Sequence, residues 1–196
     1  MEAPQSRYAA PAIVLHWAIA AFILTNLYLG LRYESAHGLA RFTVLQLHKS
    51  VGFTVLALSL LRLAWRLVNP PPPYPASMKP WEKLAATTVH WALYGVMIGL
   101  PLTGWVIVSA SPTNIPTLLY KTVPFPFLGF VHALPMATRR MLEDKVGDVH
   151  VFLAFSTMAL LVGHIGAALK HQFWDRDEVL HQMLPFVRLG VRAESP

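Results

Sequence analysis

Two histidines lie fourteen residues apart in the last apolar stretch of the chain, at His150 and His164. An α-helix turns about 100° per residue, so fourteen steps return to nearly the same face roughly 21 Å further along the axis. An imidazole is costly in lipid and usually serves a function there. The spacing therefore suggests two cofactors, one near each surface of a bilayer.

The composition excludes several other kinds of site. Of the 196 residues, 55% are hydrophobic and 13% are charged, whereas a soluble domain carries about 25% charged residues. The chain has no cysteine, which excludes disulfides, thiolate metal sites and iron–sulfur clusters and argues against covalently attached haem. The net charge is +6, but Lys and Arg lie at the ends of apolar stretches. Membrane lipid headgroups are therefore the expected partner, and nucleic acid is not.

Four apolar segments are long enough to cross a bilayer as helices, at residues 11–31, 44–67, 84–108 and 146–169. A helical span needs about 20 residues, and lipid offers no partner to backbone groups left outside a helix. The sequence predicts an all-α membrane protein, in which residues 1–196 form a single domain built on a four-helix transmembrane bundle.

The segments between the spans differ in character. The first, about 32–43, is short. The second, NPPPPYPASMKP at 69–80, cannot be helical because proline lacks the amide donor and fixes φ, so we expect an extended strap outside the membrane. The third, about 109–145, is expected to lie at the membrane interface. Its last part, MATRRMLEDKV at 136–146, is expected to extend the fourth helix into water.

The two ends of the chain are expected on the same side of the membrane, because the number of spans is even. In the C-terminal tail, 170–196, residues 175–184 are predicted to form a short surface helix that ends at Pro185. The terminus side carries nine of the Lys and Arg residues and the opposite side carries seven. This small excess favours cytoplasmic termini.

The depth of each histidine in the predicted spans decides how the histidines pair. His16 begins the first span and His164 ends the fourth, both on the terminus side, whereas His48 and His150 begin the second and fourth spans on the opposite side. A b-type haem needs two neutral imidazoles that face each other from different helices. The predicted ligand pairs are His16 with His164 and His48 with His150, so haem groups would bind between the helices.

Other residues in the spans fit this prediction without deciding it. Gly52 lies one turn after His48 and leaves room for a flat macrocycle. Arg62 lies at the depth of the His16–His164 pair, where it could hold a haem propionate or equally reach the lipid headgroups. His90 has three open roles: a competing ligand, a propionate partner, or the border of a substrate pocket. Histidine also binds zinc or copper, so metal transport is an alternative, but the spans contain almost no carboxylate.

Together these residues resemble the bacterial cytochrome b561 family. The matching segments are LHW at 15–17, LHKSVG at 47–52, LRLAWRLVNPPPP at 61–73, VHWALY at 89–94, DVH at 148–150, GHIGAALKHQFW at 163–174 and MLP at 183–185. They extend over nearly the whole chain, and their combination is more specific than any one of them. The resemblance implies a multi-pass protein of the bacterial inner membrane that holds two haem b groups with the four histidines named above.

The family includes superoxide:ubiquinone oxidoreductases, so the resemblance implies an enzyme. Superoxide would deliver electrons on the periplasmic side, and ubiquinone would accept them near the cytoplasmic side. The resemblance places quinone contacts at His171 and at Lys83 or Lys79 of the proline-rich segment. By residue type alone, His171 with Lys170 and Trp174 is more typical of an interfacial anchor.

Superoxide is an anion, so a positive field would raise its encounter rate. Lys49, Arg139 and Arg140 are the candidate steering charges, although ordinary helix-end charges are an equally good interpretation. Two other functions stay open. One is a membrane electron carrier that docks a separate redox partner protein on residues 109–145. The other is a metal transporter or a structural membrane protein without haem.

Overall fold

The computed structural model describes residues 7–184, and within them four long helices dominate. They are α1 (Ala10–Ser35), α2 (Gly38–Val68), α3 (Pro80–Ala110) and α5 (Met136–Lys170). All four are long and apolar enough to cross a membrane. Each predicted span lies inside one of these helices. The prediction of an all-α membrane protein with a four-helix bundle is therefore confirmed.

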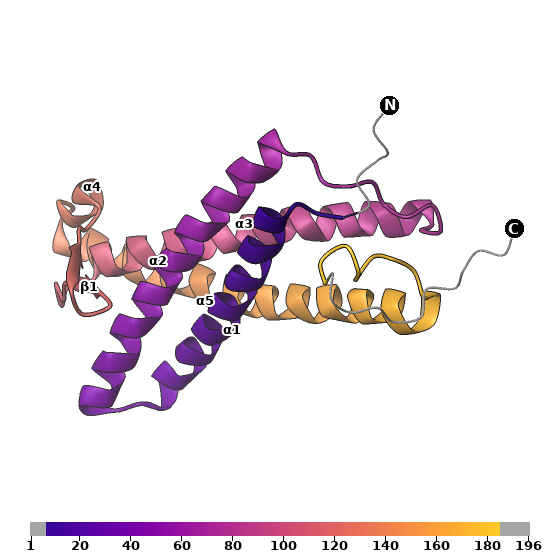
Figure 1. Cartoon of the computed structure of the whole chain (residues 1–196). Coiled ribbons are helices and arrows are strands. Elements are labelled where there is room, and N and C mark those ends of the chain that lie inside the picture. The colour runs from indigo at the N-terminus through magenta and orange to yellow at the C-terminus, as the bar shows by residue number, and fades with distance from the viewer. Residues whose placement is uncertain (1–6, 185–196) are drawn as a thin grey trace, which may run out of the picture.

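The helices form two antiparallel pairs, α1 with α2 and α3 with α5, and Figure 1 shows the pairs crossing obliquely. The two pairs meet mainly where α2 packs on α3. The buried core at this crossing contains Ile19 and Ile23 of α1, Val55 of α2, and Tyr94 and Met97 of α3. The core is small because most apolar side chains face outward, as expected when the surrounding medium is lipid.

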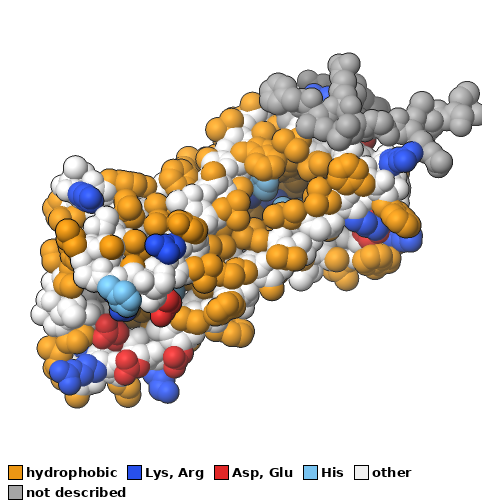
Figure 2. Space-filling view, turned by 90° about the horizontal axis from the view of Figure 1, so that it is seen from below, with side chains coloured by type: hydrophobic (Ala, Val, Ile, Leu, Met, Phe, Trp, Pro, Cys, Tyr) orange, Lys and Arg blue, Asp and Glu red, His pale blue; other side chains and the backbone are white. Residues whose placement is uncertain are grey.

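The surface has an apolar middle and charged ends. Figure 2 shows apolar side chains over most of one face, while charged side chains gather at its two ends. Large side chains such as Phe152, Phe155 and Val162 of α5 are more than half exposed. Such a band matches the hydrocarbon layer of a bilayer, with charges at the headgroups. Figure 2 also shows histidine atoms at the bottom of a hollow in the apolar band.

One end of the bundle is built from segments that are far apart in the sequence, and we call it the terminus end. Here the strap between α2 and α3 is extended, as predicted, and begins at the α2 C-cap Asn69. The backbone N–H of Tyr8 donates to the carbonyl of Gln182 at 3.4 Å, and the Gln182 side chain donates to the carbonyl of Pro73 at 3.3 Å. These contacts tie the first residues, the strap and the last described turn together.

The predicted connection between the first two spans is longer than the one in the structure. The first connection contains only Ala36 and His37, because α1 and α2 continue beyond the apolar spans.

Residues 175–184 do not form the predicted surface helix. Instead, α5 continues as a π-helical turn, His171–Asp175, and Arg176 with φ of 55° reverses the chain into turns. The helix prediction was wrong because Asp177 bonds back to the turn, accepting from the N–H of Val179. Pro185 lies outside the described residues.

The opposite end, which we call the hairpin end, is formed by residues 111–135. Strand β1 (Thr117–Leu119) pairs with β2 (Val123–Phe125) in antiparallel register, and the short helix α4 (Gly129–His132) follows. The turn residues Tyr120 and Lys121 both have positive φ. Nothing in the sequence signalled this hairpin, because its strands are short, β2 contains a proline, and the turn lacks Asn or Gly. The predicted helical extension at 136–146 is confirmed, since α5 begins at Met136.

A row of polar side chains on α2 holds the hairpin. Gln46, Ser50 and Thr54 are spaced four residues apart and so share one face. The N–H of Leu118 donates to Gln46 Oε1 at 3.2 Å, and the N–H of Tyr120 donates to Ser50 Oγ at 2.9 Å. The hydroxyls of Thr54 and Tyr120 lie 2.6 Å apart. The hairpin is therefore fixed to the helix that also carries His48.

Replacement of Ser50 by Ala is expected to loosen the hairpin. Ser50 is 1% exposed, and the variant removes the acceptor of the partly buried Tyr120 N–H, at a cost of about 1.5 kcal/mol. Hydrogen exchange of residues 117–125 should become roughly tenfold faster or more. The control is Ser156→Ala, because the Ser156 hydroxyl bonds only within α5. Equal exchange in the two variants would show that Ser50 does not hold the hairpin.

Candidate haem sites

The tertiary structure brings together both predicted histidine pairs. The ring centroids of His48 on α2 and His150 on α5 lie 6.1 Å apart, and those of His16 on α1 and His164 on α5 also lie 6.1 Å apart. A first-row metal bonds an imidazole nitrogen at about 2 Å, so two imidazoles on opposite sides of one metal ion place their centroids about 6 Å apart. Both pairs thus have the spacing that a shared haem iron requires, and their role as ligands stays a prediction.

Hydrogen bonds orient the pair nearer the hairpin end. His48 Nδ1 lies 3.1 Å from the carbonyl oxygen of Asn26, which can only accept, so Nδ1 carries the hydrogen. His150 Nδ1 lies 2.8 Å from Thr103 Oγ1, and the Thr103 hydroxyl donates to the carbonyl of Leu100 at 2.7 Å. His150 Nδ1 is therefore also a donor. Both rings keep Nε2 as a lone-pair nitrogen, which is how metal-bound histidines are commonly held.

Glycines allow close packing around this pair. A Cβ atom at Gly30 of α1 would lie 3.4 Å from His48 Cε1, and one at Gly104 of α3 would lie 3.5 Å from His150 Cε1. A larger side chain at either position would crowd the rings. Gly52, predicted to make room for a macrocycle, instead faces α1, because its Cβ would lie 3.3 Å from Asn26 Nδ2.

Two buried polar nitrogens without hydrogen-bond partners among the described residues lie beside the pair nearer the terminus end. His90 of α3 lies 5.5 Å from His164 between ring centroids, and its buried Nδ1 has no partner among the described residues. Arg62 Nε is likewise buried and unpaired, and its guanidinium lies over the ring of Tyr94. A buried donor without a partner is costly. An acidic group of a bound cofactor, such as a haem propionate, would accept from Arg62 Nε, and from His90 in the tautomer that carries its hydrogen on Nδ1, so the residues present fit haem.

Arg62 also lines a small pocket at the terminus end, together with Tyr8, Arg66 and Tyr94. Burial raises the pKa of the Tyr8 phenol, so this group stays neutral near pH 7. The Arg66 guanidinium lies over the rings of Trp91 and Tyr94. Neither arginine forms an ion pair with a carboxylate among the described residues, so the lining of this pocket is locally positive.

The three candidate steering residues occupy different environments. Arg140 is exposed, whereas Lys49 is 9% exposed and Arg139 is 5% exposed. The Arg139 guanidinium donates to the carbonyl of Ala110 at 3.1 Å and to Asn114 Oδ1 at 2.7 Å, so it holds the turn that follows α3. The sequence could not distinguish the two adjacent arginines. Steering stays a prediction for all three, and Arg139 has a structural task as well.

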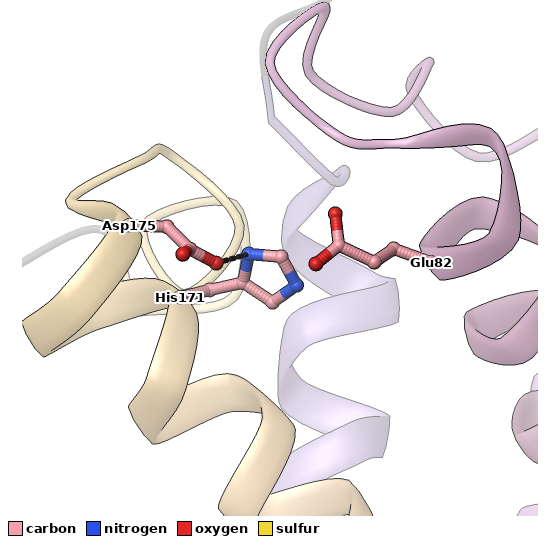
Figure 3. A group of neighbouring side chains, drawn as sticks. All are labelled: Glu82, His171 and Asp175. Atoms are coloured by element: carbon pink, nitrogen blue, oxygen red, sulfur yellow. Dashed lines mark ion pairs between the residues drawn. The ribbon is translucent and has the colours of Figure 1, made fainter.

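The predicted quinone residues all lie at the terminus end. His171 follows α5 and is buried, and its ring lies close to Glu82 in the first turn of α3 (Figure 3). Lys79, the N-cap of α3, and Lys83 are neighbours of Glu82 in the sequence. Lys170 Nζ lies 2.6 Å from Glu82 Oε1. This hydrogen bond lowers the pKa of the Glu82 carboxyl, so Glu82 is ionised at neutral pH.

Sequence reasoning missed several residues around these sites. Thr103 holds His150, and Asp175 and Asp177 hold His171. The only available signal for Thr103 was a hydroxyl in an apolar span. The charged segment DRDE at 175–178 is typical of a solvent-exposed tail and gave no sign of a contact with His171. In both cases the partner is identified only by the fold.

Comparison with known proteins identifies the family. The family model described as prokaryotic cytochrome b561 matches residues 7–186. The chain belongs to the prokaryotic cytochrome b561 family. It is 30% identical to cytochrome b561 homolog 2 of Escherichia coli, over 91% of each chain. It is 26% identical to cytochrome b561 homolog 1 of the same organism, over 92% of this chain and 98% of the relative.

A third relative has a more specific name. The chain is 26% identical to the probable superoxide oxidase CybB of Yersinia pestis, over 71% of this chain and 73% of the relative. As a member of the cytochrome b561 family, the chain is a membrane b-type cytochrome that carries electrons, and the family implies haem b. This sets aside the alternative of a metal transporter or a structural protein without haem.

Replacement of Thr103 by Val is expected to weaken haem binding by the His48–His150 pair. Val keeps the shape of Thr but removes the hydroxyl that lies 2.8 Å from His150 Nδ1 and accepts its hydrogen. Loss of such an outer partner typically weakens metal binding by roughly 10- to 100-fold. The measurement is the ratio of haem to protein during dilution against apomyoglobin. Thr103→Ser keeps the hydroxyl and should retain haem, and equal retention in the two variants would contradict the prediction.

Proposed function

We propose that this cytochrome is a superoxide:ubiquinone oxidoreductase that moves electrons across the bacterial inner membrane. It would bind two haem b groups, one at His16 and His164 and one at His48 and His150, with both termini in the cytoplasm. The observation that carries the proposal is that α5 holds one histidine of each pair, fourteen residues apart, with both pairs at 6.1 Å. The similarity to a probable superoxide oxidase supports the choice of substrate.

The chain's own residues would bind and orient the cofactors. His16 and His164 would hold one haem iron and His48 and His150 the other, so both haem groups would transfer electrons without binding oxygen. Arg62 has an unpaired buried donor that suits a propionate of the haem nearer the terminus end, and His90 would donate to a propionate as its Nδ1–H tautomer. When bound, the haem groups supply one-electron transfer. The protein's contribution is to fix their position and to exclude water from the apolar band.

The proposed reaction uses one substrate at each end of the bundle. Two superoxide anions each lose one electron and become oxygen, while one ubiquinone gains two electrons and two protons and becomes ubiquinol. At the hairpin end, Lys49 and Arg140 would attract the anion. At the terminus end, His171 and either Lys79 or Lys83 would contact the quinone.

A second candidate function is supported by the surface of the hairpin end. Tyr120, Val123 and Phe130 are about half exposed or more. Apolar side chains on the surface of a loop can form the centre of a docking site. The chain would then be an electron carrier that receives electrons from a separate redox protein. This candidate predicts that the pure cytochrome does not react rapidly with superoxide.

Superoxide pulses on purified, oxidised cytochrome distinguish the two candidates. Rapid reduction of the haem absorption bands, followed by reoxidation that requires added ubiquinone, is expected for the oxidoreductase. If superoxide leaves the haem oxidised, the docking carrier is the better description. Combined Lys49→Gln and Arg140→Gln replacements should slow the reduction severalfold and weaken its dependence on ionic strength. The control is Arg176→Gln, which removes a positive charge at the opposite end, and an equal effect there would contradict steering.

Loss of single histidines tests the ligand pairs directly. Replacement of His48 or His150 by Ala should remove the haem near the hairpin end and leave the other, so the ratio of haem to protein should fall by half. His16→Ala and His164→Ala should have the same effect on the other haem. The measurement is the pyridine haemochrome assay with the spectrum of the haem that remains. Full haem content in any of the four variants would disprove that ligand assignment.

A further inference from the structure

Five charged or titratable side chains meet at the end of α5, and we call them the His171 cluster: Glu82, Lys170, His171, Asp175 and Asp177. Lys170 Nζ lies 2.6 Å from Glu82 Oε1 and 2.7 Å from Asp175 Oδ2. His171 Nδ1 lies 2.7 Å from Asp177 Oδ2 and 3.0 Å from Asp175 Oδ2. The cluster contains three carboxylates and one lysine, so one or two negative charges remain, depending on whether His171 is charged.

The two aspartates decide which nitrogen of His171 carries its permanent hydrogen. An ionised carboxylate only accepts hydrogen bonds, so Nδ1 must donate its hydrogen to Asp177, with the Asp175 carboxylate beside it. The other ring nitrogen, Nε2, is turned away from Asp175 and toward the side where Glu82 lies (Figure 3). Nε2 is therefore the atom that can gain and lose a proton while Nδ1 stays bonded.

Burial and hydrogen bonds fix the side chain of Asp177 against His171 Nδ1. Its side chain is 7% exposed and that of His171 is 8% exposed, so water competes little for the contact. Its second oxygen, Oδ1, accepts from the N–H of Val179 at 3.1 Å, and its own N–H donates to the carbonyl of His171 at 3.2 Å. The reversal of the chain at Arg176 returns Asp177 to the ring of His171.

The contact between α5 and α3 does not depend on Asp177. The ion pair between Lys170 and Glu82 already joins the end of α5 to the start of α3, and Glu82 Oε2 also accepts from the backbone N–H of Lys79 at 2.9 Å. The contacts of Asp177 are with His171 and with its own turn. A metal ion is also a poor occupant, since Lys170 Nζ already lies between the two nearest carboxylates.

We propose that Asp177, assisted by Asp175, is a positioning residue that makes His171 a proton donor to the quinone. The proposal rests on the proposed function, in which the quinone binds at His171. When the quinone has received two electrons from the cytochrome, the Nε2–H bond of His171 breaks and an O–H bond forms on one quinone oxygen. The second quinone oxygen takes its proton from water. Water on the cytoplasmic side then returns a proton to Nε2, so two protons are consumed for each quinol formed.

The dependence of quinone reduction on pH should change when Asp177 is replaced. The charged groups that face His171 are Glu82 from α3, Lys170 and Asp175 from the end of α5, and Asp177 from the turn. Replacing Asp177 by Asn keeps an oxygen acceptor for His171 Nδ1 but removes the negative charge 2.7 Å from that nitrogen. The alkaline decline in the rate of quinone reduction should then move to lower pH than in the native protein.

The test measures haem reoxidation by decylubiquinone in the full-length holoprotein in lipid nanodiscs, from pH 5.5 to 9. Asp177→Asn should slow maximal reoxidation about tenfold near pH 8 and move the alkaline decline to lower pH, with little change in the KM for quinone. Asp177→Glu should restore much of the rate. The matched control is Glu178→Gln, which removes an exposed neighbouring carboxylate. Reduction of the haem by superoxide should be unchanged in all of these variants.

Other outcomes separate the positioning role from the quinone site itself. A native rate and pH profile in Asp177→Asn, with slow reoxidation in His171→Ala, would overturn the positioning role and leave the quinone site in place. Native reoxidation in His171→Ala would disprove the quinone site and, with it, the inference. Should Asp177→Asn lose haem, Asp175→Asn is measured in the same way. It should give a smaller shift in the same direction, and an unchanged profile would overturn the inference.

Discussion

The structure depends on one constraint, which is that α5 must present two imidazoles to two different helices at two depths. A spacing of fourteen residues keeps His150 and His164 on one face of a straight helix. His48 from α2 meets the first and His16 from α1 meets the second. The oblique crossing of the two helix pairs follows, since one pair must reach α5 at both depths (Figure 1).

Hydrogen bonds and ion pairs fix the arrangement of the helices, which apolar packing alone does not specify. In lipid, packing alone distinguishes poorly between arrangements of apolar helices, so hydrogen bonds between helices carry much of the specificity. Gln46 and Ser50 fix the hairpin to α2, and Thr103 fixes the ring of His150. The ion pair of Lys170 with Glu82 does the same at the terminus end. The candidate sites at both ends are thus built on polar side chains, as functional sites in membranes usually are.

The sequence predicted the parts of this protein that depend on local pattern. The four spans, the extended strap and the pairing of histidines by depth all follow from the length, composition and spacing of single segments. The prediction of a surface helix at 175–184 was wrong, because the side chain of Asp177 bonds locally and the chain reverses at Arg176. The hairpin at 117–125 was missed, because its short strands depend on contacts with α2 rather than on their own propensity.

The sequence by itself determined how many helices cross the membrane and which histidines share a depth, because helix geometry converts residue spacing directly into distance and face. Only the tertiary structure decided which nitrogen of His48 and of His150 is free, that Arg139 is buried, and that two aspartates hold His171. Most of these outcomes depend on groups far apart in the chain: Thr103 and His150 are separated by 47 residues, and Glu82 and Lys170 by 88. No local pattern encodes such contacts, because they form only when the helices have packed.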